Sequence, residues 1–298
     1  KATLPLEHKE RIMGVLVQYP DVNGTLVDWA PLAKEVKELG GLLIAATDLL
    51  ALTMIKSPGE WGADVAVGNA GRFGVPPGYG GPQAGFFAAS DAIKRRMPGR
   101  LIGVSRDADG RPAYRLSLQT REQHIRREKA TSNICTAQAL LANMSAMYAV
   151  YHGPRGLRRI AAKVHALTIV LKKQLEQLGA KVVNRDGAFF DTLTIEAPAS
   201  KVHKEATAKR INLRRISDDH VGVTLDETVS VEDMTDVINS FARAMSKPEI
   251  AAQDLVASTM EQGLSAESLD SLSFDTNFAR TSPYLTQPVF NSHHSETA

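Results

Sequence analysis

The sequence stretch that decides the fold is residues 64–87, DVAVGNAGRFGVPPGYGGPQAGFF. A short β-branched run begins it, a second apolar run ends it, and the loop between them (residues 71–82) contains five glycines and three prolines. Glycine permits positive φ angles and close approach of the backbone to a ligand, whereas proline stiffens the chain. This composition fits a structural turn between two strands. It fits equally a rigid loop at a strand end, where open α/β sheets bind their ligands.

The residues before this stretch have the pattern of a parallel β-α-β unit. Residues 12–18 form a compact apolar run, and residues 28–39 repeat apolar side chains at helical spacing up to Gly40, a favoured helix C-cap. Residues 41–47 then have the composition of a fully buried strand. A strand, a helix and a strand in this order predict a parallel sheet, to which residues 65–67 and 84–88 add two further strands.

The second half of the chain has the pattern of a smaller α/β domain. A helix is predicted over residues 134–151, and it is apolar nearly all round, so we expect it to be buried. Pro154 begins another helix, whose apolar stripe continues up to Gly179. The further elements expected are strands at 181–183, 192–195, 211–214 and 221–224, and helices near 200–210 and 231–245.

We therefore expect three parts. Residues 1–152 belong to a large domain that is truncated at its amino end, because the first residue opens almost directly onto a strand. Residues 153–247 form the smaller domain. Residues 248–298, rich in serine, alanine and acidic residues before a proline-containing end, are a linker or tail that extends over another domain.

Composition excludes several classes of protein. The formal net charge of +2 gives no reason to expect binding to nucleic acid or to a membrane surface. No uncharged apolar run reaches membrane-spanning length. The single cysteine, Cys135, excludes an intrachain disulfide and fits a reducing compartment. We expect a soluble, intracellular protein.

Several sequence motifs, spread over nearly the whole chain, resemble those of one protein family. They are Arg72-Phe-Gly with residues 78–82, residues 97–100, residues 119–138, residues 225–228, and residues 280–291 with 294–297. They resemble the amino-terminal half of the P-protein of the glycine cleavage system, glycine dehydrogenase (decarboxylating), a fold-type-I enzyme that depends on pyridoxal 5'-phosphate (PLP). The resemblance implies an α/β fold with a PLP-transferase-like large domain and a smaller carboxyl-terminal α/β domain.

The same resemblance indicates that a lysine expected in cofactor-binding members of the family is replaced here by Arg72. In family members that carry the cofactor, the lysine that forms the Schiff base with PLP stands at this position when the sequences are aligned on the Gly-Gly-Pro motif. A guanidinium stays protonated and cannot serve as the imine-forming amine. We therefore expect this half to be inactive alone and the covalent cofactor to be held by a carboxyl-terminal half. If this chain did form an imine, Lys56 or Lys129 would have to supply the amine.

The resemblance implies an activity for the complete enzyme. Glycine is decarboxylated with PLP, and the aminomethyl group passes to the lipoyl arm of the H-protein. The partners would be the carboxyl-terminal half and the lipoylated H-protein, in a homodimer or an α2β2 assembly. The compartment would be the cytoplasm of a bacterium or the mitochondrial matrix of a eukaryote. The alternatives are a catalytically silent scaffold subunit and a different fold-type-I PLP lyase, such as a cysteine desulfurase-like enzyme.

Candidate cofactor contacts gather at the start of the helix predicted over residues 134–151. Thr131, Ser132 and Asn133 are favoured N-cap types, and a helix amino terminus also binds phosphate. Their word resembles the Gly-Thr-x-Asn of related enzymes, whose threonine reaches the PLP phosphate of the neighbouring subunit. Contact with cofactor held by the partner, and simple capping, are both open. Cys135, one turn further on, is expected to be a buried inert thiol, with a redox-sensitive thiolate as the other interpretation.

Six other residues are candidates for a functional role. Asp48 ends a strand and resembles the aspartate that pairs with the PLP ring nitrogen, but we favour a helix N-cap. His165 is interpreted as a helix-surface histidine. Asp226 and Glu227 are interpreted as structural, because adjacent strand residues point to opposite faces. The pair His293–His294 lacks acidic or cysteine companions at ligand spacing, so no metal site is expected.

Two segments are candidates for contact with a partner. Residues 91–128 are polar and strongly basic, which is typical of a solvated face. The alternative is a surface that meets the other half or an acidic carrier protein. The resemblance also suggests that the tail crosses the other half's site, which would bring Ser295 and Glu296 near it.

Overall fold

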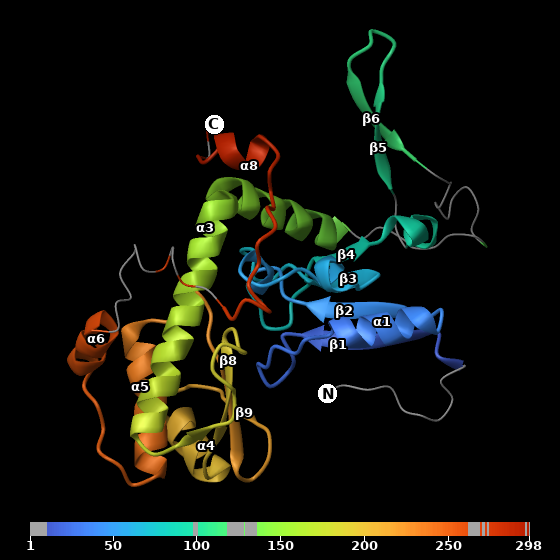
Figure 1. The fold of residues 1–298 in the computed structure, drawn as a ribbon. Helices are drawn as coiled ribbons and strands as arrows, with labels where there is room; N and C mark the ends of the chain where they lie inside the picture. The colour runs from blue at the N-terminus through green and yellow to red at the C-terminus, as the bar shows by residue number, and fades with distance from the viewer. Residues whose placement is uncertain are drawn as a thin grey trace.

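The computed structural model describes residues 11–97, 101–117, 128, 136–261, 269, 272, 274–295 and 297. The described part of the chain contains two four-stranded sheets, a long bent helix and a projecting hairpin, together with shorter helices (Figure 1). In the described part of the chain, no helix combines the length and the apolar character needed to cross a membrane.

The first sheet confirms the predicted β-α-β unit. Strands β1 (Gly14–Tyr19), β2 (Leu42–Thr47) and β3 (Val65–Asn69) are parallel, and β4 (Gly85–Ala89) pairs antiparallel with β3. Helix α1 (Ala30–Glu38) packs Leu32 and Val36 into the same core as Val17 and Leu43. The helix ends before Gly40, whose φ of 74° needs a residue without a side chain. The strands that carry the glycine-rich loop are therefore fixed on a packed layer.

A long helix, α3 (Thr136–Gln177), links the first sheet to the second half of the chain. It breaks at Gly153 (φ 62°, ψ 178°), and Pro154 begins its second segment, as the sequence predicts. The second segment is buried, with Leu157, Leu171 and Leu175 inaccessible to solvent. The prediction that the first segment is buried all round is wrong for the described chain, because four large side chains spaced along one face are exposed. They are Leu140, Met144, Met147 and Tyr151.

The second sheet is antiparallel, in the order β7-β8-β10-β9. Its strands are β7 (Lys181–Val182), β8 (Thr192–Glu196), β9 (Arg214–Arg215) and β10 (His220–Thr224). The helices of this half include α4 (Ala199–Ala208), α5 (Val231–Ala244) and α6 (Ala252–Glu261). A core that includes Ile195, Val221 and Phe241 joins the sheet to α3, and Leu255 of α6 belongs to it. The chain after residue 247 therefore still contributes to this core.

Two features lie outside the sheets. Strands β5 (Ile102–Arg106) and β6 (Pro112–Leu116) form a hairpin that the sequence analysis did not predict, and it projects away from the rest (Figure 1). The tail packs on its own chain: the guanidinium of Arg280 donates to the carbonyl of Leu52 (2.8 Å), and the hydroxyl of Tyr284 donates to that of Pro154 (2.7 Å). A short helix, α8 (Val289–Ser292), follows. The tail is therefore anchored here rather than only extended over another domain.

Candidate functional site

The glycine-rich loop after β3 places Arg72 between two carboxylates. Its Nη1 lies 2.6 Å from Oδ2 of Asp191, just before β8, and 3.4 Å from Oδ2 of Asp48, just after β2. The first contact joins residues 119 positions apart in sequence. The three side chains meet at the carboxyl ends of parallel strands, the edge at which such sheets place their sites. They also connect the first sheet to the second.

Burial and charge act against each other in this cluster. Burial disfavours the charged form of Arg72, but the carboxylates of Asp48 and Asp191 outweigh it and raise the pKa of the guanidinium. Burial raises the pKa of Asp48; Arg72 opposes this, while the neighbouring Asp191 adds to it. Asp191 also accepts a hydrogen bond from the hydroxyl of Thr192 (2.9 Å). One guanidinium thus serves two carboxylates, and the cluster has no surplus positive charge.

The side chain of Asp48 also fixes the backbone turn that follows β2. Its Oδ1 accepts a hydrogen bond from the backbone N–H of Leu50 (2.9 Å), at the start of a short 3₁₀ turn over Ala51–Thr53. The bond closes a turn ahead of the 3₁₀ segment, whose N-cap residue is Leu50, so Asp48 is not the predicted helix N-cap. Its other oxygen faces Arg72, so one side chain performs both tasks.

Arg72 borders a cavity of about 810 Å³ between the glycine-rich loop and the turn after β10. The turn contributes Asp226, Glu227 and Thr228. The premise that Asp226 and Glu227 are adjacent strand residues is wrong, because β10 ends at Thr224 and both line the cavity. Oδ1 of Asp226 accepts bonds from the backbone N–H (2.8 Å) and hydroxyl (2.7 Å) of Thr228, which is a structural role. Within the described chain, the carboxylate of Glu227 has no hydrogen-bond or ion-pair partner.

The residues of this site do not fit a covalently bound PLP. None of the residues that line the cavity is a lysine. Arg72 and Asp48 stand where the resemblance places the Schiff-base lysine and the partner of the ring nitrogen, and their side chains touch each other. Atoms 3.4 Å apart leave no room for a ring between them. Lys56 lines a different cavity, beside Tyr19 and Trp61, and Lys129 lies outside the described residues.

The predicted cofactor contacts in trans also lie outside the described residues. These are Thr131, Ser132 and Asn133, together with Cys135. Glu296 falls outside as well, whereas Ser295 is described and exposed. Their proposed roles stay predictions.

His165 corrects the sequence analysis, because it is buried rather than on a helix surface. Its Nδ1 lies 2.8 Å from the carbonyl oxygen of Phe190, and its ring stacks on Phe274 at a centroid distance of 4.3 Å. Burial lowers its pKa to about 4, although the carbonyl of Phe190 and the charge of Asp191 oppose this. The imidazole is therefore a neutral core group at neutral pH.

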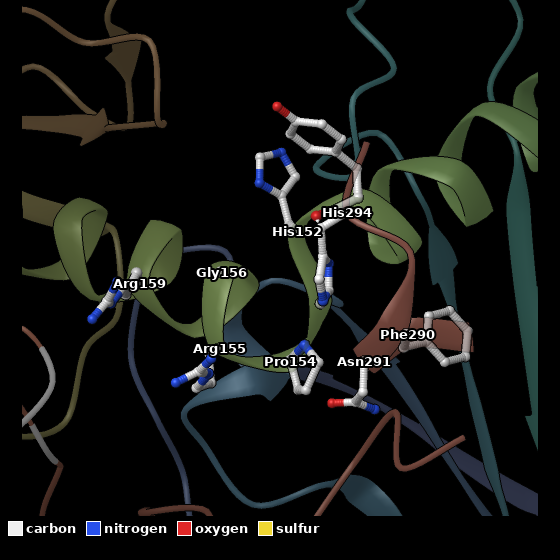
Figure 2. A pocket seen from close by; sticks show the side chains of 10 residues that line it. His152, Pro154, Arg155, Gly156, Arg159, Phe290, Asn291 and His294 are labelled. Carbon is white, nitrogen blue, oxygen red and sulfur yellow. Dashed lines mark hydrogen bonds between the residues drawn. The ribbon is translucent and has the colours of Figure 1, made fainter. Parts of the chain in front are cut away.

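A second cavity, of about 370 Å³, lies at the break in α3 (Figure 2). The tail forms one wall of it: Nδ1 of His294 lies 3.0 Å from the carbonyl oxygen of Tyr151, and Phe290 and Asn291 also line the cavity. A side chain on Gly153 would meet the carbonyl oxygen of Phe290 at 2.7 Å, so this close approach requires glycine. In the part of the chain that is described, no three His, Cys, Asp or Glu side chains gather as metal ligands. The tail therefore covers a helix break.

Sequence reasoning missed Asp191. It follows the buried pair Phe189–Phe190, and a carboxylate inside such an apolar run must find a partner if it is buried. That signal was available, but the partner, Arg72, is far away in the sequence. Only the fold brings the two together.

Comparison with solved structures first defines the class. A cysteine desulfurase from Thermococcus onnurineus NA1 covers 80% of this chain and 62% of its own, with a TM-score of 0.54 and 16% identity, which shows the fold alone. The chain thus has the α/β fold of fold-type-I PLP enzymes. A glycine decarboxylase (P-protein) of the glycine cleavage system, solved in inhibitor-bound form, has a TM-score of 0.73 and 34% identity over 82% of this chain and 57% of its own.

The family follows from the sequence comparisons. The model of the glycine cleavage system P-protein family matches residues 2–241, and the chain belongs to this family. Glycine dehydrogenases (decarboxylating) from Paraburkholderia xenovorans and Cupriavidus metallidurans are 54% and 53% identical over 286 and 285 residues. These matches cover 95% of this chain but 28% of each relative. The chain therefore spans little more than a quarter of the length of the relatives it matches.

Proposed function

We propose that this chain is the part of a glycine dehydrogenase (decarboxylating) that completes a PLP site held by another half. The observation that carries the proposal is Arg72, which is tied to Asp48 and Asp191 where a covalent site would need a free lysine and an unengaged aspartate. A site closed in this way supports no imine chemistry of its own. Membership of the P-protein family, with only 28% of its relatives' length covered, supports a catalytic half elsewhere.

In the complete enzyme, the proposed reaction is decarboxylation of glycine and transfer of the aminomethyl group to the lipoyl arm of the H-protein. PLP would be bound covalently by the carboxyl-terminal half. This chain's share is to position that half and to line its pocket. The proposed assembly is a homodimer or α2β2, in the bacterial cytoplasm or the mitochondrial matrix.

Thr131 is the residue of this chain that we propose contacts the PLP phosphate in trans, with Ser132 and Asn133 beside it. All three precede α3, and N–H groups at a helix start with hydroxyl neighbours suit a phosphate. Replacement by Ala is expected to weaken PLP binding in the complete enzyme without changing how tightly the halves associate. Unchanged PLP affinity would remove Thr131 from the site.

The first experiment adds PLP to the purified chain, with and without the catalytic half, and records the absorbance band of the internal aldimine. We expect no band from the chain alone. With the catalytic half we expect a band together with glycine–bicarbonate exchange. A band from the chain alone that borohydride fixes would contradict the proposal and assign the imine to another lysine, Lys56 or Lys129 being the first to test.

The second candidate function is a scaffold that only stabilises the active half. The close Arg72–Asp191 ion pair, which joins the two sheets, favours a rigid body that could serve this purpose. The two functions differ in one readout. Loss of exchange activity at unchanged affinity between the halves, in Thr131→Ala, supports site sharing, whereas a scaffold loses activity only when association fails.

A further inference from the structure

The hairpin of β5 and β6 has one apolar face that no described residue covers. Ile102 pairs with Leu116, and Val104 pairs with Tyr114. Alternate strand residues point to the same side, so these four side chains share one face. Their exposed fractions are 59% for Ile102, 49% for Leu116, 74% for Val104 and 83% for Tyr114. The opposite face carries Gly103, Ser105, Ala113 and Arg115.

The turn of the hairpin is nevertheless held by specific hydrogen bonds. The carboxylate of Asp107 accepts hydrogen bonds from the backbone N–H groups of Asp109 and Arg111, both at 2.9 Å. Arg106 donates to the carbonyl of Gly110 (2.7 Å), whose φ of 82° turns the chain. Charged residues of both signs thus gather at the tip, where Arg106 ends the face that Ile102 and Val104 share. This sorting is typical of a strand pair with one buried face.

An isolated two-stranded hairpin is only marginally stable in water, so its apolar face needs a cover. The hairpin projects away from both sheets of its own chain (Figure 1). Contiguous apolar patches of this kind mark interaction sites. The cover must therefore come from outside the described residues.

We propose that the apolar face of the β5–β6 hairpin is a permanent docking arm for the catalytic half of the P-protein. This inference rests on the proposed function, because it takes as its occupant the half postulated there. Two observations select that occupant. The face is apolar except for Arg106 at its tip end, as in permanent interfaces, whereas a shuttling carrier such as the H-protein would meet a more polar one. The chain accounts for 28% of the length of its relatives, so a large body of polypeptide is available to cover the arm.

The sequence pattern of the basic region 91–128, which contains this hairpin, predicts a solvated face or else a surface for the other half or for an acidic carrier protein. The arrangement of side chains on the two strands favours a surface for the other half. The apolar residues are interspersed with polar ones in sequence, yet the strand period collects them on one side. A docking arm of this kind contacts its partner through Val104 and Tyr114, the most exposed pair, rather than through the arginines. An aromatic residue flanked by aliphatic ones is a common core for an interface.

The first test is photo-crosslinking in the assembly of this chain with the catalytic half. Benzoylphenylalanine is introduced at position 114, and at position 115 on the opposite face as the matched control. We expect position 114 to crosslink to the catalytic half with at least five times the yield of position 115. A crosslink to a second copy of this chain, a crosslink to the H-protein, or equal yields from both positions would overturn the proposal.

The second test measures the affinity between the halves. The double variant Val104→Ser/Tyr114→Ser is expected to raise the Kd for the catalytic half at least tenfold. Arg111→Ser at the tip is the control and is expected to change it less than twofold. Circular dichroism and the Tm of the chain alone must stay the same, since the hairpin lies apart from both cores. A Kd unchanged in the double variant would refute the docking arm.

The two proposals fail differently. If the wild-type pair forms the PLP band and exchanges bicarbonate while the double variant binds normally, only the docking arm is wrong. If the wild-type pair associates through the hairpin but forms no band, the shared site is wrong. If the wild-type halves do not associate, both proposals fall.

Discussion

Replacing Arg72 by Met tests the ion cluster most directly. Methionine keeps much of the aliphatic length of arginine and removes the charge. The side chains of Arg72, Asp48 and Asp191 are 23%, 23% and 10% exposed, so the two carboxylates would remain largely buried without a cation. Removing one partner of a buried ion pair costs about 3–5 kcal/mol. Because the cluster keeps some solvent contact, we expect a loss of roughly 2–3 kcal/mol in the free energy of unfolding.

The pH dependence of the free energy of unfolding provides a second, independent test of this prediction. Burial already raises the pKa of Asp48 and the Arg72 guanidinium opposes this, so removing the guanidinium raises the pKa of Asp48 further. A folded-state pKa that is raised means that the folded state binds more protons than the unfolded state. The variant is therefore relatively more stable at low pH, and it loses stability as pH rises through the raised pKa.

Urea unfolding of the isolated chain at pH 5, 6, 7 and 8 measures both effects. Lys94→Met breaks the exposed pair with Asp91 and is the control, with an expected cost below about 1 kcal/mol. A double-mutant cycle of Arg72→Met with Asp191→Asn should show a coupling energy of at least about 1 kcal/mol. A cost for Arg72→Met no larger than that of the control, with additive effects in the cycle, would refute a stabilising role for the cluster.

Three further predictions use other parts of the chain. Burial lowers the pKa of His165 from 6.5 to about 4. Between these pH values the folded state therefore binds fewer protons than the unfolded state, so the free energy of unfolding falls by about 3 kcal/mol as pH drops from 6.5 to 4. In urea titrations, His165→Gln should make the free energy of unfolding less dependent on pH over this range. Tyr284→Phe removes the bond to the carbonyl of Pro154 and should cost about 1 kcal/mol, with no change expected for the fully exposed Tyr79→Phe. Phe241→Ala in the core beneath the second sheet should cost about 3–5 kcal/mol in the same assay; a loss below 1 kcal/mol would contradict the assigned core.

The regular elements could be predicted because their information is local. Residues 28–39 repeat apolar side chains with the helical period, and Gly40 ends the helix through its positive φ. Pro154 begins the second segment of α3 because proline suits a first turn and opposes a helix interior. The strand predicted at residues 211–214 was displaced to Arg214–Arg215, since short strands are fixed by pairing rather than by composition.

Distant contacts explain two of the errors, and the alternation of side chains along strands explains the third. His165 carries no local sign of burial, because its cover comes from Phe190 and Phe274, far along the chain. The hairpin was missed because its four apolar residues are diluted by arginine and aspartate in the sequence and gather only on one face of the strands. Arg72 was located by resemblance, but its binding to Asp191 could not be read locally, since 119 positions separate the two.

The identity of residue 72 matters beyond the loss of an imine-forming amine. Asp48 sits at the end of a buried strand and holds the turn after it, so its carboxylate stays in place whether or not a cofactor is present. A neutral residue at position 72 would leave that carboxylate beside Asp191 with no cation from the loop. The guanidinium reaches both carboxylates through the same nitrogen, and its charge does not depend on pH in the working range. Arginine therefore stabilises a site without a cofactor, which a lysine, with a compact ammonium and a pKa that burial lowers, would do less well.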